Sequence, residues 1–119
     1  MAMGTRARAW IAAGAWAVVI FALSSRPGPV VPFELFPFQD KFGHFIQYAI
    51  FGALLFRALR GARHAHLWAI LIASIYGVTD EFHQSFVPDR IASATDLCAD
   101  VLGAAFAQAG FLVKGERHS

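Results

Sequence analysis

The chain has 119 residues, of which 57% are hydrophobic and only 15% are charged, whereas a soluble domain carries about 25% charged residues. The mean hydropathy is +0.51, so the composition argues against an ordinary soluble domain and predicts a membrane protein. The net charge is +2, without any run of lysine or arginine interleaved with aromatics, which argues against nucleic-acid binding. Cys98 is the only cysteine, which excludes an internal disulfide and a multi-cysteine metal site.

The first apolar segment covers residues 9–25, contains no charge and follows Arg6 and Arg8. A cleaved signal peptide is the alternative interpretation, because Ala22-Leu23-Ser24 resembles a cleavage site. Three further apolar segments follow in the sequence, and they favour an uncleaved first span over about residues 8–25.

The connection after this segment, residues 26–39, is rich in proline and in apolar side chains. Proline lacks the backbone N–H and clashes with the preceding helical turn, so a continuous helix is excluded here. The prolines are Pro27, Pro29, Pro32 and Pro37. The valine, leucine and phenylalanine side chains between them predict a structured extracytoplasmic loop in the interfacial layer of the membrane.

Three more segments have the character of short membrane spans. Residues 42–56 lie between Lys41 and Arg57, residues 67–79 run into Asp80 and Glu81, and residues 101–113 follow Asp96 and Asp100. Because a helix needs about 17 to 25 residues to cross a bilayer, each span must extend into its charged flanks. We predict a single all-α domain over residues 1–119, a bundle of four transmembrane helices, with these three spans at about 41–59, 66–86 and 91–113.

The basic residues indicate the orientation of the bundle. Seven of the ten fall on one side of a four-span arrangement, which the positive-inside rule makes cytoplasmic; these are Arg6, Arg8, Arg57, Arg60, Arg63, Lys114 and Arg117. Arg26, Lys41 and Arg90 fall on the other side, together with seven of the eight acids. We therefore expect both termini in the cytoplasm and an acidic outward side.

Polar side chains recur at helical spacing in the outward halves of three segments. Residues three or four apart share a helix face, and the three sets are Lys41, His44 and Tyr48; Tyr76, Asp80 and Gln84, with Glu81 on an adjoining face; and Ser93, Asp96, Asp100, Gly103 and Ala107. Polar groups at that depth should face each other rather than lipid, because exposing a charge to hydrocarbon is costly.

Structural roles are the alternative for several of these residues. Neutral groups can form interhelical hydrogen bonds, and we weigh this structural role against a role in the site for Gln47, Tyr48, Tyr76 and Ser93. Gly103 and Ala107 are expected to allow close helix packing. For His83, a structural role and a functional role stay equally open. For Lys41, Glu81, Arg90 and Asp96, the structural alternative is a network of salt bridges.

Three blocks carry a likeness to a known family: Ser24-Ser25-Arg26-Pro27; Asp40-Lys41-x-x-His44-x-x-x-Tyr48; and Asp80-Glu81-x-x-Gln84 with Phe86, Pro88, Arg90, Ser93, Asp96 and Gly103. In this order and spacing the chain resembles the VanZ-like family of small integral membrane proteins, which is associated with resistance to the glycopeptide teicoplanin. The resemblance covers about residues 9–110 and implies the fold and the cell-envelope context. The family pattern generally has asparagine where this chain has Asp100, so an additional acid is expected here.

The mixture of charges leads to a functional hypothesis. We expect an outward-facing pocket in a bacterial cytoplasmic (inner) membrane that binds, and processes as a hydrolase or transferase, the anionic headgroup of an envelope lipid or lipid-linked cell-wall intermediate. The expected catalytic residues are His44, Glu81 and Asp96. The expected substrate-binding residues are Lys41, Arg90, Gln84, Asp40, Tyr48 and Ser93, with Arg26 as a further anion contact.

Three alternatives stay open. The first is a non-catalytic lipid-binding or transport protein, and the second is a structural protein whose polar cluster only holds the helices together. The third is a metal-dependent version of the site, in which the ligands would be His44, Glu81, Asp96 and Asp100. Their oxygen-rich chemistry suits a divalent cation such as Mg, Ca or Mn better than zinc. No cofactor is firmly predicted, and the expected partners are the lipid bilayer and the anionic lipid.

Overall fold

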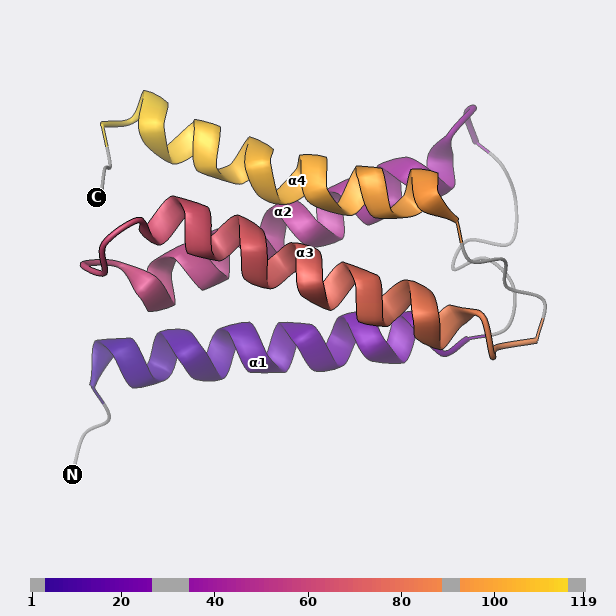
Figure 1. Cartoon of the computed structure of the whole chain (residues 1–119), viewed down its shortest axis with the longest axis horizontal. Coiled ribbons are helices and arrows are strands. Elements are labelled where there is room, and N and C mark those ends of the chain that lie inside the picture. Colours follow the sequence, from indigo (N-terminus) through magenta and orange to yellow (C-terminus); the bar gives the residue numbers. More distant parts are fainter. Residues whose placement is uncertain (1–3, 27–34, 89–92, 116–119) are drawn as a thin grey trace.

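The computed structural model describes residues 4–26, 35–88 and 93–115, and over these residues the chain is all-helical, without a strand. Four helices follow one another: α1 (Thr5–Ser24), α2 (Gln39–Leu59), α3 (Ala65–Gln84) and α4 (Ala94–Val113). Figure 1 shows them running back and forth along one long axis. The predicted all-α fold is confirmed, and each helix end lies within three residues of the corresponding predicted span.

Three of the helices, α1, α2 and α4, are long and apolar enough to cross a membrane. α3 has 20 residues but carries the acidic pair Asp80 and Glu81 in its last two turns, and its membrane crossing stays a prediction. In the proline-rich connection, residues 27–34 lie outside the described residues, so the interfacial loop also stays a prediction. Leu35 and Phe38, at the end of that connection, are exposed.

α2 packs against each of the other three helices, most extensively against α4, and α3 packs against α4 and more sparsely against α1. Glycines make the crossing of α2 and α4 close. An added Cβ at Gly103 would collide with the carbonyl oxygen of Phe45 and lie 3.0 Å from the backbone nitrogen of Ala49. At Gly52, an added Cβ would lie 2.9 Å from the Cα of Ala104. The prediction that Gly103 serves helix packing therefore agrees with the structure.

α3 turns a stripe of small residues toward the bundle. Ala65, Ala69, Ala73 and Gly77 recur every four residues and are all buried, which lets the helix backbone approach its neighbours closely. Glu81 is the next residue at the same spacing and is also buried. The face of α3 that packs against the bundle therefore also places an acid in the interior.

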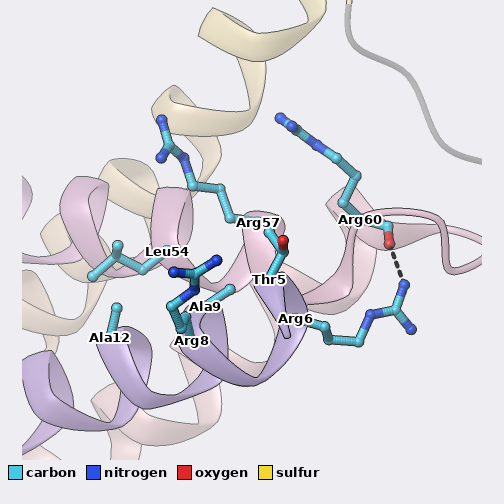
Figure 2. A pocket seen from close by; sticks show the side chains of 8 residues that line it. All are labelled: Thr5, Arg6, Arg8, Ala9, Ala12, Leu54, Arg57 and Arg60. Carbon is cyan, nitrogen blue, oxygen red and sulfur yellow. Dashed lines mark hydrogen bonds between the residues drawn. The ribbon is translucent and has the colours of Figure 1, made fainter. Parts of the chain in front are cut away.

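The two ends of the bundle differ in charge. α1 and α3 begin, and α2 and α4 end, at the end of the bundle that we call the basic end (Figure 1); it carries Arg6, Arg8, Arg57, Arg60, Arg63 and Lys114. There the guanidinium of Arg6 donates a hydrogen bond to the carbonyl oxygen of Arg60 at 2.8 Å (Figure 2). The opposite, acidic end carries every described carboxylate, namely Asp40, Asp80, Glu81, Asp96 and Asp100.

Candidate functional site at the acidic end

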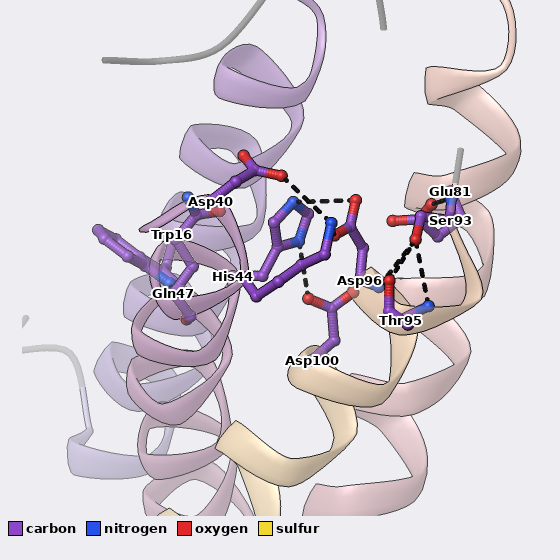
Figure 3. Close-up of polar contacts among 10 residues, drawn as sticks. Trp16, Asp40, His44, Gln47, Glu81, Ser93, Thr95, Asp96 and Asp100 are labelled. Carbon is purple, nitrogen blue, oxygen red and sulfur yellow. Dashed lines mark hydrogen bonds and ion pairs between the residues drawn. The ribbon is translucent and has the colours of Figure 1, made fainter. Parts of the chain in front are cut away.

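His44 on α2 lies between two carboxylates of α4 (Figure 3). Its Nδ1 is 2.9 Å from Oδ1 of Asp100, and its Nε2 is 3.8 Å from Oδ2 of Asp96. Asp96 and Asp100 are one helical turn apart, so both point from the same face of α4 toward α2. All three residues are buried, and Asp100 is fully so. The histidine is thus fixed in orientation by a buried acid.

Lys41 lies one turn before His44 and forms the outer layer of the cluster. Its Nζ is 2.7 Å from Oδ1 of Asp96 and 3.8 Å from Oδ2 of Asp40. The side chain of Lys41 is 36% exposed and that of Asp40 is 54% exposed. A cation that is reachable from outside therefore stands next to the buried histidine.

Glu81 connects the end of α3 to the start of α4. Its Oε2 accepts a hydrogen bond from the backbone N–H of Ser93 at 2.6 Å. Ser93 is the N-cap of α4, and its Oγ accepts from the backbone N–H groups of Thr95 and Asp96. Ser93, which we expected to contact substrate, therefore caps α4 and satisfies donors that a helix start leaves free.

Several buried polar atoms in the same region have no hydrogen-bond partner among the residues that the structure describes. They are the Tyr48 hydroxyl, Oε1 of Glu81, Oε1 of Gln84 and Oδ2 of Asp100. Tyr48 is fully buried one turn after His44 and lies within electrostatic range of Asp80, Glu81 and Asp100. Because unpaired buried polar groups are costly and uncommon, their concentration here points to a site for a ligand.

The cluster has the donor atoms for a cation. One ligand atom from each of His44, Asp80, Glu81 and Asp100 lies within 4.8 Å of the others, and a second set is formed by Asp40, His44 and Asp96. Ligands on opposite sides of Mg²⁺ or Ca²⁺ are about 4 to 5 Å apart, since metal–oxygen distances are ~2.0–2.6 Å. One nitrogen and three carboxylates are a donor set for a hard divalent cation.

A groove opens beside this cluster at the surface. Its volume is about 440 Å³, and among the described residues that line it Lys41 is the one charged residue. The other lining residues come from the segment before α2, from α2 and from α4; they are Phe36, Pro37, Phe38, Phe42, Phe45, Ala99 and Leu102. An apolar groove with one cation at its edge is complementary in polarity to a molecule that has an apolar chain and an anionic headgroup.

The sequence over residues 9–114 matches the family model VanZ/LLP1, which is nearly the whole chain. The chain belongs to the VanZ/LLP1 family. Comparisons with curated proteins and with solved structures give no significant match. VanZ membership and the three apolar helices are consistent with a membrane protein linked to glycopeptide resistance.

In this VanZ protein, most of the residues expected at the site come together from α2, α3 and α4. Lys41, His44, Glu81, Asp96 and Asp40 lie in one cluster with Ser93. Tyr48 and Gln84 are buried rather than accessible. Arg90 lies outside the described residues, so its expected place among the acids stays a prediction.

One acid, Asp80, was not among the site residues expected from the sequence, and Asp100 was expected only as a ligand in the metal-dependent alternative. In the structure Asp100 contacts His44, and Asp80 has an oxygen among the four grouped donor atoms. Their spacing was a usable signal, because Asp100 follows Asp96 by one turn and Asp80 precedes Gln84 by one turn. The groove at Lys41 gave no comparable signal, since its lining comes from two stretches that are far apart in the sequence, residues 36–45 and 99–102.

Other polar side chains attach α1 to the bundle. His83 Nε2 is 2.8 Å from Ser25 Oγ, and its ring stacks on Phe21. The Tyr76 hydroxyl donates to the carbonyl oxygen of Ala17 at 2.5 Å. These contacts favour the structural alternative for His83 and Tyr76.

Proposed function

We propose that the acidic end faces outward from a bacterial cytoplasmic membrane and binds the anionic headgroup of an envelope lipid or lipid-linked cell-wall intermediate. The observation that carries this proposal is the groove at Lys41. Its apolar walls suit an acyl or polyprenyl chain, while Lys41 supplies a positive charge for phosphate or carboxylate. Since Lys41 is one turn from His44, a headgroup held by this amine lies next to the buried histidine.

The same arrangement supports chemistry at the headgroup, by hydrolysis or by transfer to an acceptor. With Nδ1 protonated toward Asp100, His44 presents Nε2 as a proton acceptor for an attacking water or hydroxyl. Asp100 would stabilise the imidazolium that forms. In this scheme Asp96 positions Lys41, Glu81 supplies a second carboxylate, and Arg90 is a second candidate contact for the anion.

Such a site would account for a link to glycopeptides. A protein that holds or alters a lipid-linked precursor changes the population of the molecules that a glycopeptide such as teicoplanin recognises. Both catalysis and binding without turnover would have this effect. The non-catalytic hypothesis therefore remains the alternative that an experiment must separate.

Turnover of a radiolabelled panel of lipid phosphates by the purified protein is the test. We expect release of a labelled product by wild type, and loss of that product with His44→Ala and with Glu81→Gln. His64→Ala is the matched control, because His64 is exposed at the basic end, before α3. Tight lipid binding without any turnover would support the non-catalytic alternative, and absence of both would overturn the proposal.

A second candidate function is metal-dependent chemistry in the same place. The observation that favours it is that Glu81 Oε1, Asp100 Oδ2 and the Tyr48 hydroxyl have no hydrogen-bond partner within the described part of the chain. A hard divalent cation there would act as a Lewis acid on a phosphate oxygen. His44 would then serve as a ligand rather than as the base, so activity of metal-depleted protein separates the two candidates.

A further inference from the structure

A second cavity lies at the basic end, between the start of α1 and the end of α2 (Figure 2). It has a volume of about 570 Å³, and four arginines from the two helices line it: Arg6, Arg8, Arg57 and Arg60. Ala12 and Leu54 form part of its apolar lining. The hydrogen bond from Arg6 to the carbonyl oxygen of Arg60 holds the two helices together at its rim.

Among the described residues, no carboxylate lies at the basic end to balance the positive charge of this cavity. The five described carboxylates belong to the acidic end. Glu116 lies outside the described residues, and one carboxylate would neutralise only one guanidinium. α1 adds to the imbalance, because its first turn contains no acid and its N-cap, Gly4, offers no side chain to the free N–H groups. Bases at a helix N-terminus oppose the helix dipole, whereas an anion there is favoured.

The positive-inside rule explains why bases occur at this end but does not explain why four of them share one cavity. Arg63 and Lys114 contribute charge at the same end without lining it. All four lining bases are arginine, whose planar fork binds phosphate through paired hydrogen bonds, whereas lysine acts as a point charge. Basic pockets between membrane helices bind the headgroups of acidic phospholipids in other membrane proteins.

We propose that this cavity binds a phosphate-bearing anion through the guanidinium groups of Arg8 and Arg57, with Arg6 and Arg60 fixing the rim. The anion is either the headgroup of an acidic phospholipid, with its chain against Ala12 and Leu54, or a free phosphate compound. The site is separate from the groove at Lys41 and does not depend on the function proposed for the acidic end.

The test compares variants that remove the same charge from the same end of the bundle. Binding of phosphatidic acid and of inorganic pyrophosphate to the purified full-length protein is measured in neutral detergent. The lining variant is Arg8→Gln with Arg57→Gln, and the matched control, which also removes two charges, is Arg63→Gln with Lys114→Gln. We expect an affinity loss of about tenfold or more for each lining guanidinium removed and less than about twofold for the control, since charge-assisted hydrogen bonds are lost only at the site.

The outcomes assign the ligand or reject the site. Binding of phosphatidic acid alone identifies a lipid headgroup, and binding of pyrophosphate identifies a free phosphate compound. If the Gln variant does not fold, Arg8→Lys with Arg57→Lys keeps the charge and should still weaken binding through loss of the forks. Equal weakening by Arg63→Gln with Lys114→Gln, or no binding of either probe by wild type, would overturn the proposal.

Discussion

His44 Nδ1 and Asp100 Oδ1 lie 2.9 Å apart in the interior of the bundle, and this contact is where α2, α3 and α4 converge. α3 takes part through Gly77: a Cβ added there would lie 3.1 Å from Asp100 Oδ2. The glycine therefore leaves room for the carboxylate that orients the histidine. Helix packing and the candidate chemistry depend on the same small residue.

Asp100→Asn should separate catalysis from lipid binding. The substitution keeps the shape of the side chain but removes the charge that would stabilise an imidazolium at His44. We expect kcat for lipid turnover to fall by roughly 10²-fold or more, a typical contribution of acid–base catalysis, while the lipid Kd changes little. Kinetics at saturating lipid and a separate binding assay provide the two measurements.

Lys41→Gln should show the opposite pattern. Its amine is the exposed cation beside the groove, so its loss should weaken binding of the anionic lipid by about tenfold, with a smaller effect on kcat. Equal effects of Lys41→Gln and Asp100→Asn on kcat and on Kd would contradict the division of roles between the two side chains.

Gly103→Ala and Gly110→Ala should change stability in opposite directions. At Gly103 the new Cβ collides with the Phe45 carbonyl oxygen, whereas at Gly110, on the same helix, nothing lies within 4 Å. We expect destabilisation of about 1 to 3 kcal/mol at Gly103 and stabilisation of up to ~1 kcal/mol at Gly110, because alanine is the better helix former. Thermal unfolding in detergent measures both, and a stable Gly103→Ala protein would mean that α2 and α4 are farther apart.

The sequence predicted the helices well because their boundaries are marked by composition. Four prolines interrupt the chain before α2, and charged residues flank each apolar segment. Spacing also predicted the shared faces of Lys41 with His44 and of Asp96 with Asp100, since a helix repeats every 3.6 residues. Spacing therefore determines which residues share a face within one helix.

The sequence predicted that the polar faces meet, but which side chains pair across them is a matter of tertiary packing that it did not reveal. Asp100, rather than Asp96, is at hydrogen-bond distance from His44 because Gly103 brings α4 against α2 at that level. Likewise, the sequence used the arginines only to predict the orientation of the bundle. The packing of α1 on α2 is what places four of them around one cavity. Both results depend on the register between helices, which periodicity leaves undetermined.

Cysteine labelling should test the orientation of the bundle. In a Cys98→Ser background, Ala62→Cys lies in the turn between α2 and α3 at the basic end, and Phe86→Cys lies just after α3 at the acidic end. We expect a membrane-impermeant maleimide added to intact cells to label position 86 and not position 62. Labelling of position 62 alone would reverse the proposed orientation, and labelling of both positions would contradict a membrane crossing by α3.

Removal and return of divalent cations should decide the metal-dependent candidate. If His44, Asp80, Glu81 and Asp100 hold a cation, protein treated with a chelator should bind Mn²⁺ at about one ion per chain, measured by electron paramagnetic resonance, and Mg²⁺ should compete.

His44→Gln and Asp100→Asn should each weaken this binding of Mn²⁺ by about tenfold or more, the range reported for ligands and their close partners. His64→Gln is the matched histidine control and should leave the affinity unchanged, because His64 is exposed at the other end of the bundle. Manganese binding that is unchanged in His44→Gln and Asp100→Asn would indicate adventitious ions elsewhere on the protein. Absence of binding to wild type, together with full lipid turnover in chelator, would show that His44 acts without a metal.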